Sequence, residues 1–203
     1  MTLTSTPQAT TMTQNYDLSG AFLTLQKGGI ILMPTDTLWS VACSAAHPEA
    51  IERLQRLVKL GNTPHHGLEL IVHSMNMLKS QVIHLHPRLE TLLVFHTRPL
   101  SMLMEAANHL PDILKDEEGH VAVRLAHDDF CIQLIGALGS PLVVAPACID
   151  GQPFPAHFGA ISSEIIEGVD HVSKYRQHER NGGEPAVMVK LMEEEEELIF
   201  LRE

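Results

Sequence analysis

The sequence predicts a single α/β domain. Short apolar runs rich in β-branched residues alternate with segments of helical periodicity from one end of the chain to the other. The alternation has no linker, repeat or low-complexity break apart from the acidic run Glu193–Glu197. With 203 residues, 44% hydrophobic and 19% charged, the chain can bury one substantial core.

The first elements each have a start or stop signal. Apolar residues at helical spacing predict a helix over residues 17–27, capped by Gly28. The run from Gly28 to Met33 predicts a buried strand that Pro34 ends. Pro48 fits the first position of the next helix. We then expect a strand over 68–72, a short helix capped by Ser74 and a helix over 87–95.

The second half continues this pattern. Residues 121–125 alternate strictly, which places Arg124 on the strand face opposite Val121, Val123 and Leu125. A helix capped by Asp128 or Asp129 should end at Gly139. We expect further strands over 99–104, 141–145 and 169–172, a helix over 156–167, and a pairing of 186–191 with 198–201.

The spacing of the cysteines and the composition of the N-terminus indicate the cellular compartment. Cys43, Cys131 and Cys148 lie far apart with no CxxC pair, which fits a reducing cytoplasm and argues against a zinc ribbon or a disulfide framework. Residues 1–16 lack the blocks of a signal peptide and are expected to be a flexible tail before a domain over 17–203. We therefore expect a cytoplasmic protein with no membrane partner.

The charge and the histidines limit the partners. A formal net charge of −11 disfavours nonspecific nucleic-acid binding, although Glu193–Glu197 supplies five of the charges and is expected to be a solvated turn. Among 13 histidines, His65-His66 and His84-x-His86 are metal-ligand candidates. No carboxylate or cysteine stands at a recognised spacing from them, so we expect no metal site.

Three small polar residues follow the first strand. Thr35, Asp36 and Thr37 occupy a turn in which backbone donors and hydroxyl groups can meet a ligand, or can merely satisfy the turn itself. This turn, continued by Trp39 and the small residues Val41–Ala45, resembles the opening of the YrdC/YciO family. That family includes L-threonylcarbamoyladenylate synthases, which act in threonylcarbamoyl modification of tRNA.

Further segments carry the resemblance from Asp17 to Glu203. Residues 53–59 are similar to the family's helix before a Lys-x-Arg motif, and residues 120–124 to its Val-x-Val-Arg strand. Residues 139–144 are similar to the strand before its Ser-Ala-Asn loop, and residues 183–191 to its Ser-Thr strand. Residues 201–203 match its Leu-Arg-Glu ending. The resemblance implies an open, twisted mixed sheet with flanking helices, and a concave, positively charged cavity for a nucleotide or double-stranded RNA.

Only part of the family's polar set is present. Thr35, Asp36, Thr37, Lys59 and Arg124 match, but Leu60-Gly61-Asn62 follows Lys59, so the second cation is missing. Pro146-Ala147-Cys148 stands where the family has Ser-Ala-Asn, which removes a hydroxyl, a backbone donor and an amide. Ala186-Val187 stands where the family has Ser-Thr, and Lys190 replaces a nearby aspartate.

Three readings follow from this mixture. The first is an active synthase that uses ATP, L-threonine and bicarbonate with Mg²⁺. The second, which the lost polar residues favour, is a protein that binds a nucleotide or small anion, or double-stranded RNA or tRNA, without the full reaction. The third is a regulatory or scaffold protein with a vestigial cavity. The candidate binding residues are Thr35, Asp36, Thr37, Lys59, Arg124, Pro146 and Cys148.

Each candidate also has a purely structural interpretation. Lys59 near a helix end complements the helix dipole. Arg124 could be an edge or surface residue, but an interior arginine usually has an anionic partner, which favours a role in the site. Cys148 has no base in the sequence to activate it and is expected to be an inert thiol. RNA binding would require Arg53, Arg56 and Lys59, spaced by three, to gather with Arg124.

Overall fold

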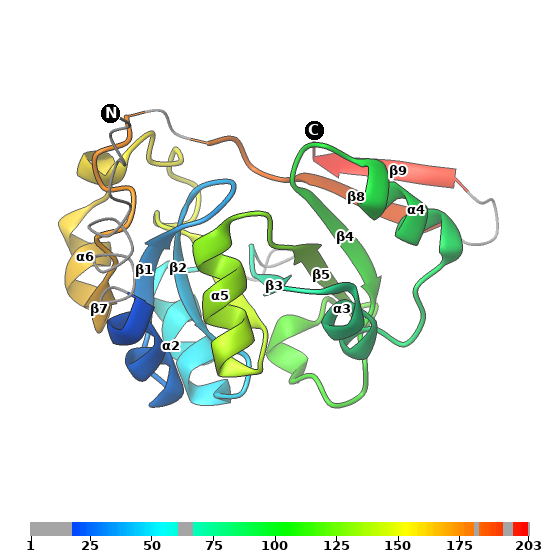
Figure 1. The fold of residues 1–203 in the computed structure, drawn as a ribbon, viewed down its shortest axis with the longest axis horizontal. Helices are drawn as coiled ribbons and strands as arrows, with labels where there is room; N and C mark the ends of the chain where they lie inside the picture. The colour runs from blue at the N-terminus through cyan, green and yellow to red at the C-terminus, as the bar shows by residue number, and fades with distance from the viewer. Residues whose placement is uncertain (1–17, 61–66, 181–182, 193–196, 203) are drawn as a thin grey trace, which may run out of the picture.

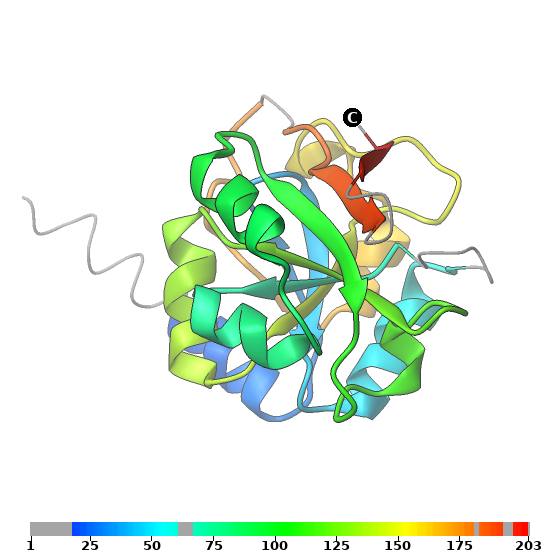
Figure 2. The same ribbon diagram turned by 90° about the vertical axis from the view of Figure 1, so that its right-hand side faces the viewer.

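A computed structural model describes residues 18–60, 67–180, 183–192 and 197–202. Its centre is one mixed sheet of nine strands in the order β7-β1-β2-β6-β3-β5-β4-β8-β9. The strand direction turns steadily along this order, so the sheet is open and strongly twisted (Figures 1 and 2). The α/β class and the open mixed sheet are therefore as expected.

The left half of Figure 1 holds the first two strands of the chain and the strands that flank them. Strands β1 (Ile31–Pro34) and β2 (Trp39–Ser44) form a tight antiparallel pair, and β7 (His171–Val172) joins β1 in parallel. On the other side of β2 lies β6 (Leu142–Pro146), also antiparallel. At one end of this pairing Ser40 lies opposite Pro146.

The right half contains the remaining strands. Strand β3 (Glu69–Val72) joins β6 to β5 (His120–Leu125), and β4 (Leu100–Glu105) follows β5. The outer hairpin is β8 (Val187–Met192) with β9 (Glu197–Arg202). The sequence prediction of this hairpin is confirmed. Of the predicted solvated turn, residues 193–196 lie outside the described residues.

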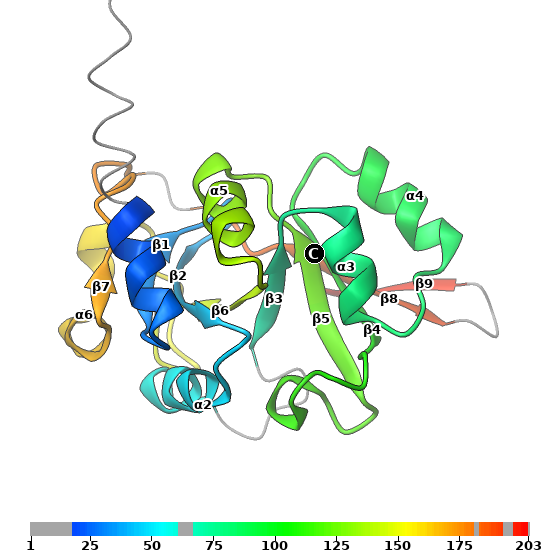
Figure 3. The same ribbon diagram turned by 60° about the horizontal axis from the view of Figure 1, so that its bottom comes forward.

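Two large apolar clusters hold helices against the sheet. One contains the helix of residues 18–26 and α5 (Asp129–Leu138), with Leu25 and Leu134 buried against Ile31. The other contains α2 (Pro48–Leu57), α3 (Met75–Gln81), α4 (Pro87–Phe95) and α6 (Ser163–Gly168). Helix α2 lies on the opposite side of the sheet from α5 (Figure 3). None of the described helices is long and apolar enough to cross a bilayer.

Most predicted boundaries agree with the local caps. Ser74 accepts a hydrogen bond from Met77 N, Asp128 caps α5, and Gly139 ends it in the left-handed conformation at φ 67°. The predicted helix over 156–167 is wrong. A 3₁₀ turn, η2 (Phe158–Ala160), ends in extended backbone at Ile161, and α6 then starts anew because Ser162 accepts from Ile165 N. A second 3₁₀ turn, η1 (Asp112–Leu114), precedes β5.

Candidate functional site

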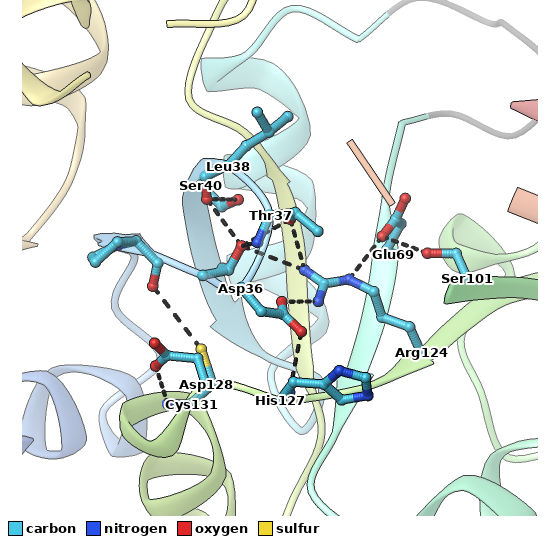
Figure 4. Close-up of polar contacts among 12 residues, drawn as sticks. Asp36, Thr37, Leu38, Ser40, Glu69, Ser101, Arg124, His127, Asp128 and Cys131 are labelled. Carbon is cyan, nitrogen blue, oxygen red and sulfur yellow. Dashed lines mark hydrogen bonds and ion pairs between the residues drawn. The ribbon is translucent and has the colours of Figure 1, made fainter. Parts of the chain in front are cut away.

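Arg124 lies at the centre of a polar cluster on β5. Its side chain is 1% exposed. The guanidinium forms an ion pair with Asp36 through Nη1 and another with Glu69 through Nε at 3.2 Å (Figure 4). Asp36 lies in the β1–β2 turn and Glu69 starts β3, so the fold brings together three segments far apart in the sequence. An inward arginine in an apolar strand has found two anionic partners, both within the protein.

The threonines of the turn close around the same guanidinium. Nη2 of Arg124 donates to Thr37 Oγ1 at 3.2 Å and to Thr35 Oγ1 at 3.4 Å. The two hydroxyl oxygens are 2.9 Å apart, and Thr35 Oγ1 also donates to the carbonyl of Leu38. Both threonines are buried. The hydroxyl groups therefore serve the turn and Arg124, which is one of the two interpretations that the sequence left open.

Arg202 completes this group of residues from the last strand. Its Nη2 donates to Glu69 Oε1 at 2.6 Å, while Ser101 donates to Glu69 Oε2 at 2.9 Å. Nε of Arg202 donates to the carbonyl of Ala186 at 2.7 Å. We call Arg124, Asp36, Glu69, Arg202, Thr35 and Thr37 the Arg124 cluster. It holds two cations and two carboxylates, so its formal charges balance.

Burial and pairing shift the ionisation of this cluster in opposite directions. Burial disfavours both charged forms, yet the guanidinium groups of Arg124 and Arg202 lower the pKa of Glu69 below its ordinary value. In the same way the carboxylates of Asp36 and Glu69 outweigh burial and raise the pKa of Arg124. Glu69 and Arg124 are therefore charged at neutral pH, and their ion pair stabilises both charged forms.

Two cavities adjoin the Arg124 cluster. The larger has a volume of about 330 Å³ and is lined by Pro146, Cys148 and Asp150 after β6, by Phe154, and by Glu69 and Arg202. The smaller, about 20 Å³, lies between Thr37, Arg124, Pro146 and the segment Pro185–Ala186. We call the larger one the Pro146 cavity. It is placed outside the end of a central strand, where open α/β sheets bind ligands.

The loop after β6 offers few polar groups to this cavity. Pro146 has no N–H, Ala147 N donates to the carbonyl of Trp39, and Cys148 N donates to the carbonyl of Pro146. Burial, with a smaller contribution from Asp150, raises the pKa of the Cys148 thiol. This agrees with the expectation of an inert thiol.

Lys59 is the one matched candidate that does not join the Arg124 cluster. It follows α2 at φ 53°, and its Nζ pairs with Glu164 at 2.7 Å. Arg53 pairs with Asp170, and Arg56 with Glu52. The structure therefore does not gather these cations with Arg124, which is buried among its own partners.

Two residues of the Arg124 cluster, Glu69 and Arg202, were not among the sequence candidates. Glu69 is the first residue of β3 and Arg202 the last of β9, so the signal available was a charged residue beside an apolar run. Asp36 Oδ2 also accepts from the backbone N–H of His127 at 3.1 Å, so the carboxylate is held from two sides. Arg176 supports the turn by donating to the carbonyl of Thr35 at 3.0 Å and to Asp128 at 3.2 Å. Neither backbone contact has a sequence pattern that predicts it.

Comparison with known families agrees with this architecture. The model of the Sua5/YciO/YrdC family, described as telomere recombination, matches residues 23–203. The chain belongs to the Sua5/YciO/YrdC family. A threonylcarbamoyl-AMP synthase from Xanthomonas euvesicatoria is 26% identical over 164 residues, which cover 79% of this chain and 87% of that protein. One from Alkalilimnicola ehrlichii is 30% identical over 129 residues, covering 64% and 66%.

Solved structures of the family share the fold. Escherichia coli YciO superposes with a TM-score of 0.79 at 19% identity, covering 94% of this chain and 89% of YciO. Pyrococcus abyssi Sua5, solved with L-threonine, gives a TM-score of 0.78 at 19% identity. That match covers 93% of this chain but only 54% of the Sua5 chain. At this identity the likeness establishes the fold of the chain.

Proposed function

We propose that this Sua5/YciO/YrdC-family chain binds an adenylate-type nucleotide in the Pro146 cavity and does not perform the full threonylcarbamoyl-AMP synthase reaction. A volume of about 330 Å³ is at the lower end of the range of ligand pockets. Pro146, Cys148 and Arg202 line this cavity and would contact the ligand. Thr35, Asp36, Thr37 and Arg124 hold the turn and Glu69 in place.

The charge of the cavity wall is the main argument against the full synthase reaction. Glu69 and Asp150 bring two negative charges and Arg202 brings one positive charge, which already pairs with Glu69. Transfer of an adenylyl group from ATP requires cations on the triphosphate and donors for the departing pyrophosphate. The described wall of the Pro146 cavity offers no such surplus of positive charge, so a monophosphate fits this site better than a triphosphate.

An active synthase is the second candidate. It is favoured by relatives named threonylcarbamoyl-AMP synthase, which align over 79% of this chain. Such an enzyme would use ATP, L-threonine and bicarbonate. The Mg²⁺ that accompanies ATP finds a poor set of donors here, because the oxygens of Glu69 already accept from Arg124, Ser101 and Arg202. Duplex RNA is disfavoured by the net charge of −11 and by the carboxylate partners of Arg53, Arg56 and Lys59.

Titration calorimetry separates these functions. We expect AMP to bind, ATP to bind no tighter than AMP, and short duplex RNA to release no heat. Arg202→Met should weaken AMP binding about tenfold, because it removes the only guanidinium on the described wall of the Pro146 cavity. Lys59→Met is the matched control and should change nothing, since Glu164 holds that ammonium group. Absence of any nucleotide binding would support the vestigial-cavity reading instead.

A further inference from the structure

A second polar cluster lies away from the Pro146 cavity, in the turn that leads into β5. Asp116, Glu118 and His120 each offer one ligand-type atom, and these atoms all lie within 4.8 Å of one another. His120 Nδ1 is 3.4 Å from Asp116 Oδ1 and 3.4 Å from Glu118 Oε2. The turn belongs to the segment that joins β4 to β5, at one end of these strands (Figure 3).

The imidazole of His120 has an unmet requirement. Its Nδ1 is shielded from solvent and faces two carboxylate oxygens at 3.4 Å, yet it makes no hydrogen bond within the described part of the chain. Buried polar atoms nearly always have a partner, so an exception points to a bound group or ion. The carboxylate of Asp116 is fixed beside it, because Oδ1 accepts from the backbone N–H groups of Glu118 at 3.0 Å and His120 at 2.7 Å. These two contacts hold the Asp116 carboxylate beside His120 Nδ1.

The two distances from His120 Nδ1 to the carboxylate oxygens match a tetrahedral ion. Bonds of about 2.05 Å to Zn²⁺ separate neighbouring ligand atoms by about 3.3 Å, close to the two distances of 3.4 Å at His120. One imidazole and two carboxylates form a donor set that Zn²⁺ accepts. We propose that Asp116, Glu118 and His120 bind a Zn²⁺ ion, with water in the fourth position.

Lys190 is placed to compete with that ion. Its Nζ lies 2.6 Å from Glu118 Oε2, the same oxygen that faces His120. A cation at the proposed position would repel this ammonium group, so Glu118 must give up or share its ion pair when Zn²⁺ binds. Removal of the Lys190 charge should therefore tighten Zn²⁺ binding, whereas removal of a ligand should weaken it.

Other histidines require their own controls. His84 and His86 line a cavity of about 290 Å³ together with His120 and Glu105, so they are an alternative source of imidazole nitrogen. His65-His66 lies outside the described residues. For these two pairs the sequence predicts no metal site, because no carboxylate or cysteine stands at a recognised spacing from them. The turn before β5 brings the side chains of Asp116, Glu118 and His120 together.

Zinc titration of the full chain, read by calorimetry and by competition with a chromophoric chelator, tests the site. We expect one equivalent of Zn²⁺ to bind. His120→Gln and Glu118→Gln should each weaken the affinity for Zn²⁺ at least about tenfold. Lys190→Met should raise the affinity for Zn²⁺ several-fold. The paired variants His84→Asn with His86→Asn, and His65→Asn with His66→Asn, should bind as the unmodified chain does. Co²⁺ bound at the same site should give the visible absorption of tetrahedral coordination.

Three results would overturn the proposal. One is unchanged binding in both His120→Gln and Glu118→Gln. Another is loss of binding in either histidine-pair variant. The third is weaker binding in Lys190→Met. Because Glu118 is largely exposed, Glu118→Gln should fold normally, and circular dichroism verifies this. If His120→Gln disturbs β5, Glu118→Gln still decides whether the cluster holds the ion.

Discussion

Gly183 lies directly against the backbone carbonyl of Thr37. A Cβ added to Gly183 would stand 1.5 Å from Thr37 O and 2.6 Å from the carbonyl carbon. Two residues on, Pro185 and Ala186 line the smaller cavity with Thr37 and Arg124. The segment before β8 is thus pressed onto the turn that holds the Arg124 cluster, and only glycine permits this approach.

Gly183→Ala should therefore cost stability. The methyl group must displace either the segment or the Thr37 turn, which we expect to lower the free energy of unfolding by about 1–3 kcal/mol. Gly136→Ala is the control, because it should change the free energy of unfolding in the opposite direction. That glycine lies within α5 with its nearest neighbour 4.0 Å from the added Cβ, and alanine there should stabilise the protein by about 0.5–1 kcal/mol. Urea unfolding measures both, and equal effects would contradict the packing described.

Removal of the Arg124 guanidinium should lower the free energy of unfolding more than Gly183→Ala does. Arg124→Met leaves Asp36 and Glu69 with fewer partners in a buried site, which we expect to cost about 3–5 kcal/mol. Arg98→Met removes an exposed ion pair with Glu184 and should cost less than about 1 kcal/mol. Similar losses for the two variants, measured by thermal or urea unfolding, would mean that the Arg124 cluster contributes little to stability.

Acid should weaken the fold through Glu69. Its folded-state pKa is lowered, so its contribution is complete above the unfolded value of about 4.3 and is lost as the pH falls through the folded pKa. The free energy of unfolding should therefore decline below about pH 4.3. Urea unfolding between pH 3 and 6 should show a smaller decline in Glu69→Gln than in the exposed control Glu117→Gln. Identical slopes in the two variants would assign the acid sensitivity to other carboxylates.

The sequence predicted most of the elements and four of the six residues of the Arg124 cluster, Thr35, Asp36, Thr37 and Arg124. Strict alternation over 121–125 placed Arg124 opposite the apolar face, and the resemblance pointed to the turn that holds Asp36. Glu69 and Arg202 lie 55 and 78 residues from Arg124, and only the sheet order makes them neighbours. Strand β2 was not predicted as a strand, because Ala, Cys and Ser have weak β-propensity and its burial on both faces removes the alternation.

The loop after β6 offers a test by restoration. Pro146→Ser with Cys148→Asn returns a hydroxyl, a backbone donor and an amide to the Pro146 cavity. Each new neutral hydrogen bond is worth about 0.5–1.5 kcal/mol, so AMP should bind about five- to a hundredfold more tightly. Calorimetry on the folded double variant measures this. Unchanged or weaker affinity would mean that the cavity is shaped for another ligand.

Pyrophosphate release is the most direct test of the proposed function. The purified chain would be supplied with ATP, L-threonine, bicarbonate and Mg²⁺, with the Xanthomonas euvesicatoria threonylcarbamoyl-AMP synthase assayed in parallel. Loss of one preorganised donor costs about a hundredfold or more in rate, and the Pro146 loop lacks several. We predict release at least about a hundredfold slower than by that relative, while AMP binding persists. Turnover at a comparable rate would contradict the account and establish the chain as an active synthase.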